Sequence, residues 1–147
     1  DVEDEQNFSL SFYVNPPFGI EFEYYLNGNL IGVALGDKTS QSFSAIYTFY
    51  KVSDKKMSLG TFSVLKQMEY ALESRIKYFY LGYYIAENAS LVYKGSFRPN
   101  EVYLDREWRP FRNAEGDVLI PQDKLQWKSS DQLVKAATHI GFANTQS

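Results

Sequence analysis

The segment Ser58-Leu59-Gly60-Thr61 comes just before a stretch whose apolar spacing predicts a helix. The N–H groups of a first helical turn have no acceptor within the helix, and the helix dipole places partial positive charge there. Such a turn suits an anionic group, in particular a phosphate. These four residues therefore predict a phosphate-binding turn, with a helix cap that contains a glycine as the alternative.

Charged side chains elsewhere suggest two further kinds of chemistry. Lys94 and Arg98 are candidates for pairing with a carboxylate, since a carboxylate favours a cationic fork or point charge. The alternative is a solvated basic turn. Asp37 and Glu101 could accept a proton from an ammonium group, or could equally fix a loop by hydrogen bonds.

Tyr80, Tyr83 and Tyr84 flank Gly82 in an aromatic segment. A glycine inside a strand indicates a bulge or a close approach of another backbone, and a bulge there would splay the sheet. Strict alternation would place Tyr83 on the face opposite the other two tyrosines. The three are candidate site residues, and at least one of them is expected in the core.

Composition narrows the possible functions. The chain has 147 residues, which suits one domain, and its formal charge is −3. That charge disfavours an extended nucleic-acid surface but permits a pocket for a single strand end. With no cysteine and one histidine, disulfides, thiolate metal sites and multi-His metal sites are excluded. No apolar run is long enough to span a membrane and the start is acidic, so we expect no membrane contact and a cytoplasmic protein.

The first half of the chain reads as strands. Residues 20–26 and 30–35 flank Asn27-Gly28, the dipeptide favoured in a type I′ hairpin turn. Residues 44–52 are β-branched and aromatic, so the three segments predict an antiparallel meander. A short element is also expected at residues 8–14.

The apolar period then changes. Residues 61–74 show the spacing of an amphipathic helix, with capping hydroxyls in the turn before it. Residues 78–85 are apolar on both faces, as in a central strand, so a right-handed parallel crossover is expected. Residues 87–93 and 131–139 are predicted as helices, and the segment up to residue 120 as turn-rich.

A meander, a glycine-containing turn, a helix and a bulged strand follow one another in the acetyltransferase (GNAT-like) α+β fold, a mixed sheet flanked by helices. Several short motifs make the resemblance more specific. In order and spacing they resemble the C-terminal domain of arginyl-tRNA–protein transferases and their bacterial leucyl relatives over residues 20–108. The motifs are Leu26-Asn27-Gly28-Asn29-Leu30-Ile31-Gly32-Val33 with Asp37, Ala45-Ile46-Tyr47-Thr48-Phe49-Tyr50, Ser58-Leu59-Gly60-Thr61-Phe62-Ser63, Tyr80-Leu81-Gly82-Tyr83-Tyr84-Ile85, and Tyr93-Lys94-Gly95 with Phe97, Pro99 and Glu101.

The resemblance implies transfer of arginine or leucine from the 3′ end of an aminoacyl-tRNA to the α-amine of a protein that begins with Asp or Glu. No cofactor is expected, because the aminoacyl-tRNA is the co-substrate. The implied roles are phosphate binding for Ser58, Leu59, Gly60 and Thr61, catalysis near the acyl carbonyl for Tyr80, Tyr83 and Tyr84, proton acceptance for Asp37 and Glu101, and acceptor binding for Lys94 and Arg98.

Two other functions stay open. The fold also suits an acetyl-coenzyme A-dependent N-acetyltransferase. A non-catalytic, degenerate transferase domain that binds protein N-termini or docks on a partner is favoured by the acidic charge and by Tyr25, which stands where an arginine is usual in the family. A second departure from the family pattern is Asn88, which stands where a cysteine is usual.

Overall fold

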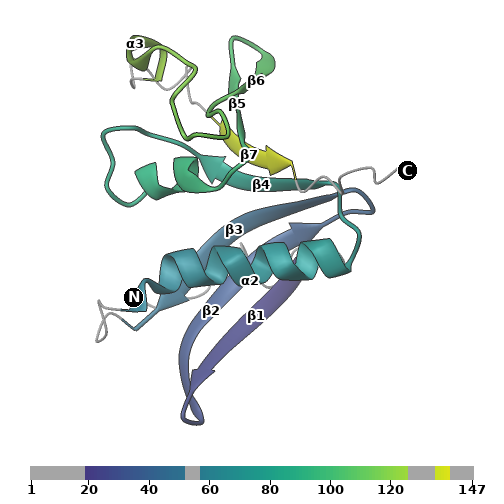
Figure 1. Ribbon diagram of the computed structural model, residues 1–147. Coiled ribbons are helices and arrows are strands. Elements are labelled where there is room, and N and C mark those ends of the chain that lie inside the picture. Colours follow the sequence, from purple (N-terminus) through teal and green to yellow (C-terminus); the bar gives the residue numbers. More distant parts are fainter. Residues whose placement is uncertain (1–18, 52–56, 126–134, 140–147) are drawn as a thin grey trace, which may run out of the picture.

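The computed structural model of the protein describes residues 19–51, 57–125 and 135–139 (Figure 1). Its strands form one mixed sheet in the order β1-β2-β3-β4-β7-β5-β6. Within the described chain, β3 and β4 are the parallel pair and the other neighbours are antiparallel. The elements are β1 Gly19–Leu26, β2 Asn29–Lys38, β3 Ser42–Tyr50, α2 Leu59–Glu73, β4 Tyr78–Tyr83, the 3₁₀ helix η2 Val92–Ser96, β5 Glu101–Leu104, β6 Glu107–Pro110, α3 Gln122–Leu125 and β7 Lys135–His139.

The predicted meander is confirmed. β1 and β2 meet in a two-residue turn at Asn27 and Gly28, whose φ angles of 50° and 79° are the positive values that a type I′ turn requires. β3 then pairs with β2, so three consecutive strands lie antiparallel. The predicted element at residues 8–14 lies outside the described residues.

Helix α2 connects β3 to the parallel strand β4 and packs across one face of the sheet, as Figure 1 shows. It begins two residues earlier than predicted, because the buried Leu59 extends its apolar face. The predicted α+β fold with a helix across a mixed sheet is confirmed. Its main core cluster comprises Phe43, Val64, Ala71, Ile76, Phe79, Leu81, Tyr84, Val102, Phe111, Ile120 and Leu125.

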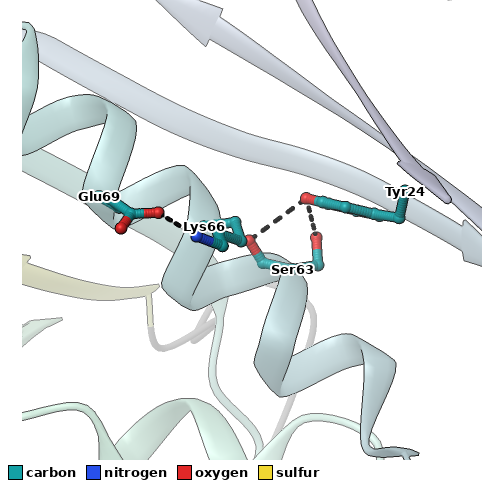
Figure 2. Close-up of polar contacts among 4 residues, drawn as sticks. All are labelled: Tyr24, Ser63, Lys66 and Glu69. Atoms are coloured by element: carbon teal, nitrogen blue, oxygen red, sulfur yellow. Dashed lines mark hydrogen bonds and ion pairs between the residues drawn. The ribbon is translucent and has the colours of Figure 1, made fainter. Parts of the chain in front are cut away.

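A buried polar network joins α2 to the sheet. The hydroxyl groups of Tyr24 and Ser63 lie 3.0 Å apart (Figure 2), and the hydroxyl groups of Thr48 and Ser63 lie 3.1 Å apart. The amide of Gln67 donates to Ser63 Oγ at 2.9 Å. Because buried hydroxyls need partners, this network fixes which turn of α2 faces β1 and β3.

The ion pair between Lys66 and Glu69 in Figure 2 lies on the exposed side of α2. Both side chains are about half exposed, at 47% and 56%. An exposed pair of this kind contributes little to stability, so the orientation of α2 depends on its buried face.

Three predictions about local structure are wrong. The Asn88 side chain accepts the Ser90 amide at 2.8 Å, which favours a turn, so residues 87–91 form turns rather than a helix and the 3₁₀ helix η2 begins at Val92. The turn-rich segment contains the hairpin β5–β6, whose turn residues Asp105 and Arg106 have φ angles of 52° and 65° without a glycine. Of the helix predicted at residues 131–139, residues 131–134 lie outside the described residues, and residues 135–139 form β7 between β4 and β5, because strand pairing there overrides helix propensity.

In the part of the chain that the structure describes, no helix has both the length and the apolar character needed to cross a lipid bilayer. Within the same ranges, no group of three His, Asp or Glu side chains could hold a metal ion.

Gly36 offers a test of the packing between β2 and β3. A Cβ atom there would overlap the ring of Phe43, which is fully buried and stacked on Phe79 and therefore has little room to move. We expect Gly36→Ala to lower the free energy of unfolding by about 1–3 kcal/mol in urea denaturation. The control is Gly60→Ala, where the nearest neighbour of a Cβ atom is Tyr93 Oη at 3.7 Å. Equal stability of the two variants would contradict this packing.

Candidate active site

The sheet opens between its two parallel strands. β3 and β4 pair through Ser42 with Tyr78, Phe43 with Phe79, and Ser44 with Tyr80, and the ladder ends there. Figure 1 shows the two strands side by side at one end and diverging toward the start of α2. The separation therefore begins in the middle of the sheet, where backbone groups are usually paired.

Each diverging strand contains a bulge next to the last pair. In β3 the pairing with β2 skips Ile46, and in β4 the pairing with β7 skips Leu81. Gly82 follows with φ of 79°, a value that a side chain would strain. A bulge bends its strand and increases the local twist. The predicted bulge at Gly82 is confirmed, and a second bulge that the sequence did not reveal lies opposite it.

A cavity of about 840 Å³ fills the opening. Its walls come from β3, from the start of α2, and from the segment that leads from β4 into η2. The lining residues are Ala45, Ile46, Tyr47, Thr48, Tyr50, Lys51, Ser58, Leu59, Gly60, Thr61, Val64, Leu81, Ala89, Ser90, Leu91, Tyr93 and Lys94.

The amino end of α2 forms one wall. Ser58 precedes the helix with φ of 44°, and its carbonyl accepts the Phe62 amide at 3.0 Å. Its side chain makes no capping hydrogen bond, which corrects the expectation of capping hydroxyls. The amides of Leu59, Gly60 and Thr61 belong to the first turn, where the helix supplies no acceptors. All four residues of the predicted phosphate-binding turn line the cavity.

The 3₁₀ helix η2 forms the facing wall and is fixed from behind. The carbonyl of Gly95 accepts hydrogen bonds from Asn100 Nδ2 at 2.9 Å and from Arg112 Nε at 2.8 Å. A Cβ atom at Gly95 would lie 2.6 Å from the ring of Phe111 and 2.9 Å from that of Tyr84. This close packing sets the position of the two residues before it, which face the cavity.

Lys94 lines the cavity next to the bulge of β4. Its Nζ atom lies 3.6 Å from where a Cβ atom on Gly82 would be. Burial lowers the pKa of the Lys94 amine below that of an ordinary lysine. No Asp or Glu is found among the described residues that line the cavity. The site thus contains a partly desolvated cation that favours an anionic ligand.

Tyr93 is a site residue that sequence reasoning did not single out. Its hydroxyl oxygen lies 3.7 Å from the position of a Cβ atom on Gly60, so the side chain reaches from η2 to the first turn of α2. Burial, and to a lesser extent the nearby Tyr50, raises the pKa of Tyr93. Tyr93 belongs to the motif Tyr93-Lys94-Gly95, which could have marked it as a candidate site residue. The sequence could not show that its side chain reaches the first turn of α2.

Five predicted catalytic residues lie away from the cavity lining. Asp37 pairs with Gly19 and Ser44 in the sheet, and Glu101 lies in β5.

The Tyr80 ring packs at 5.8 Å from Trp108, and Tyr84 is buried against Phe111 at 5.0 Å, where burial raises its pKa. Tyr83 is 45% exposed at the end of β4. Because of the bulge at Leu81, strict alternation cannot be used to assign these tyrosines to the two faces of the sheet. Their catalytic roles stay predictions.

Arg98 and Lys94 are not brought together at the cavity. The Arg98 side chain is on the surface, where Nη1 donates to the Ala114 carbonyl at 3.1 Å. The same guanidinium group lies against Gly116. In this arrangement Arg98 fixes the loop after β6 rather than lining the cavity with Lys94.

Tyr25 belongs to a different surface. It is 58% exposed, and its hydroxyl donates to Glu23 at 2.8 Å. It lines a separate groove of about 620 Å³ between β1 and the start of α2, together with Tyr24 and Phe62.

Solved structures share the fold. The ribosomal-protein-S18-alanine N-acetyltransferase from Escherichia coli superposes with a TM-score of 0.60 at 12% identity, covering 97% of this chain and 81% of that one. An acetyltransferase of Bacillus subtilis in complex with CoA gives 0.55 at 20% identity, covering 95% and 84%. The predicted GNAT-like fold is therefore confirmed.

Relatives found by sequence identify the family more closely than the solved structures do. The chain is 40% identical to an aspartate/glutamate leucyltransferase of Saccharophagus degradans over 83 residues, and 37% identical to one of Methylobacillus flagellatus over 109 residues. These matches cover 56% and 74% of this chain but only 35% and 43% of those relatives. The family described as the C terminus of arginine-tRNA-protein transferase matches residues 1–104, and the chain belongs to that family.

Proposed function

We propose that this chain forms the aminoacyl-transfer site of an aminoacyl-tRNA–protein transferase, and that the transferred amino acid is leucine. The observation that carries the proposal is the cavity between β3 and β4, where the amino end of α2 and the Lys94 amine line one space. That space offers an anion site for a nucleic-acid end and a cation for an acidic acceptor.

The reaction needs positioning more than a reactive side chain. An α-amine attacks the ester carbonyl of the aminoacyl-tRNA, an amide forms, and the ribose hydroxyl leaves. No covalent enzyme intermediate is required, so the absence of cysteine from the chain is compatible with the chemistry. Placing the two reactants side by side can lower the barrier by roughly 7–11 kcal/mol in the best-oriented cases.

The donor's phosphates would bind the amides of the first turn of α2, between Ser58 and Thr61. A single strand end needs only this local anion site, so the net charge of −3 is no obstacle. The part of the cavity between the strands is apolar, with Ala45, Val64 and Leu81 in its lining. A leucine side chain suits that lining, whereas a guanidinium group would be desolvated without a carboxylate partner among the described lining residues.

The acceptor's acidic side chain would pair with Lys94. The lowered pKa of this lysine reflects the cost of burying its charge, and a carboxylate at hydrogen-bond distance would offset that cost. Arg98 is the weaker candidate, because its guanidinium group already donates to the Ala114 carbonyl.

The donor assignment predicts a preference. With leucyl- and arginyl-tRNA supplied separately to the full-length gene product, we expect transfer of leucine to be more efficient by roughly 10-fold or more, since an unpaired buried polar group costs about 1–3 kcal/mol. The measurement is kcat/KM for transfer to one acceptor peptide. Equal or reversed efficiencies would contradict the assignment. Micromolar binding of acetyl-coenzyme A in calorimetry, without transfer from either tRNA, would favour an acetyltransferase.

The acceptor assignment predicts a loss of acidic preference. We expect Lys94→Ala to reduce the preference for peptides with N-terminal Asp over Ala by a few kcal/mol, whereas a solvated pair would contribute about 0–1 kcal/mol. Arg98→Ala is the matched control and should retain most of the preference, with folding checked for both variants. An unchanged preference in Lys94→Ala would exclude this role.

The same assignment predicts a pH dependence. The carboxylate pairs only with charged Lys94, so the preference for Asp over Ala should fall as pH rises through the Lys94 pKa. Because burial lowers that pKa, the fall should begin at lower pH than for an ordinary lysine. The titration of each peptide's own amine is measured separately and divided out before the ratio is taken. A ratio that stays constant up to the pKa of an exposed lysine would contradict the prediction.

A further inference from the structure

The leaving group of the proposed reaction needs a proton, and this inference rests on the proposed function. Breaking the ester bond leaves charge on a ribose oxygen, which is a strong base. That oxygen belongs to the terminal nucleotide, whose phosphate would bind the amino end of α2. A side chain that donates this proton would therefore lie within one nucleotide's reach of the first turn of α2, in the same cavity.

Tyr93 has the position that such a donor requires. Its hydroxyl oxygen lies 3.7 Å from the Cβ position of Gly60, the second residue of α2, and Tyr93 also lines the cavity. The ring packs edge-on against Phe97 at 6.1 Å, and the next residue but one, Gly95, is fixed by two hydrogen bonds to its carbonyl. The hydroxyl is thus placed by a rigid support.

Other hydroxyl groups in the cavity are less suitable. Serine and threonine hydroxyls are far weaker acids than a phenol, whose ordinary pKa is about 10. Thr48 is already within hydrogen-bond distance of Ser63 Oγ. Tyr47 and Tyr50 are about half exposed, at 53% and 47%, and lie on the wall formed by β3. The Tyr93 hydroxyl, by contrast, lies 3.7 Å from the Cβ position of Gly60 in the first turn of α2.

We propose that Tyr93 donates the proton to the leaving ribose oxygen. The C–N bond forms as the ester C–O bond breaks, and the electron pair of that bond goes to the ribose oxygen, which takes the Tyr93 proton. The attacking nitrogen must lose one proton to become an amide nitrogen, and that proton returns to the Tyr93 oxygen. Atoms and charges balance, and Tyr93 is regenerated without a further reactant.

The environment of Tyr93 fits this role. Burial, followed by the nearby Tyr50, raises the pKa of the Tyr93 hydroxyl, so that the proton is present throughout the neutral pH range. The same burial makes the tyrosinate unfavourable and so promotes return of the proton.

A one-atom change in the donor tests the proposal. The donors are two minihelices with the same 3′-terminal adenosine, one carrying leucine as an ester on the 3′-oxygen and the other as a thioester on a 3′-sulfur. A thiolate leaves without protonation, because an ordinary thiol has a pKa of about 8.5. In single-turnover transfer by the full-length gene product, we expect Tyr93→Phe to lose roughly 10²–10⁴-fold in rate with the oxygen ester. With the thioester the loss should be less than about threefold, since the thiolate leaves unprotonated and can itself take the proton that the nitrogen loses.

The two donors separate the possible outcomes. A normal rate with the thioester shows that the variant is folded and binds both substrates. Equal losses with both donors would mean that Tyr93 only positions other groups, and no loss with either would leave it without a role; both results overturn the proposal. If Tyr50→Phe shows the selective loss instead, the donor is Tyr50. Tyr103→Phe is the neutral control, because Tyr103 lies in β5 outside the cavity lining and phenylalanine keeps the ring that packs on Trp108. A parent protein that transfers leucine from neither donor would overturn the proposed function itself.

Discussion

β3 and β4 are joined by three residue pairs, and the side chains of the middle pair pack against each other just before the two strands diverge. Phe43 and Phe79 are register partners whose rings stack at 5.4 Å, and both are fully buried. On one side of this stack the sheet is continuous, and on the other the strands diverge around the cavity. The bulges at Ile46 and Leu81 begin within two residues of the last pair, so the packed core and the open site share one boundary.

The position of every proposed binding group depends on that boundary. Helix α2 is oriented by the hydroxyl of Ser63, which contacts Tyr24 and Thr48 across the sheet, and its first turn therefore points into the opening. η2 is fixed to the opposite side through Gly95. A partial positive charge and a desolvated amine consequently line one space in a chain whose formal charge is −3. The net charge of the whole chain is therefore a poor guide to the charge at the site.

The sequence predicted what local patterns determine. Asn27-Gly28 specified the hairpin, the change of apolar period located α2, and Gly82 indicated the bulge in β4. It could not predict β7, because residues 135–139 become a strand only by pairing with β4 and β5. The β5–β6 turn at Asp105 and Arg106 was missed because positive φ angles without glycine leave little signal.

The site was predictable only in part, because its composition is decided by long-range packing. Ser58, Leu59, Gly60, Thr61 and Lys94 do line one cavity, as their motifs suggested. Nothing local showed that Arg98 would bond the Ala114 carbonyl or that Tyr84 would pack against Phe111. Tyr93 was overlooked for the same reason, since its neighbour at Gly60 is more than thirty residues away in the chain.

The central claim is that the cavity between β3 and β4 receives the aminoacylated end of a tRNA. The most direct measurement is the change in backbone amide NMR shifts when a stable minihelix, carrying leucine through an amide bond at its 3′ end, is added to the ¹⁵N-labelled full-length gene product. The account predicts that the largest changes fall on the amides of Leu59, Gly60 and Thr61 and on those of Leu81 and Gly82. Changes confined to the β5–β6 hairpin or to the groove between β1 and α2, or no changes at all, would contradict it.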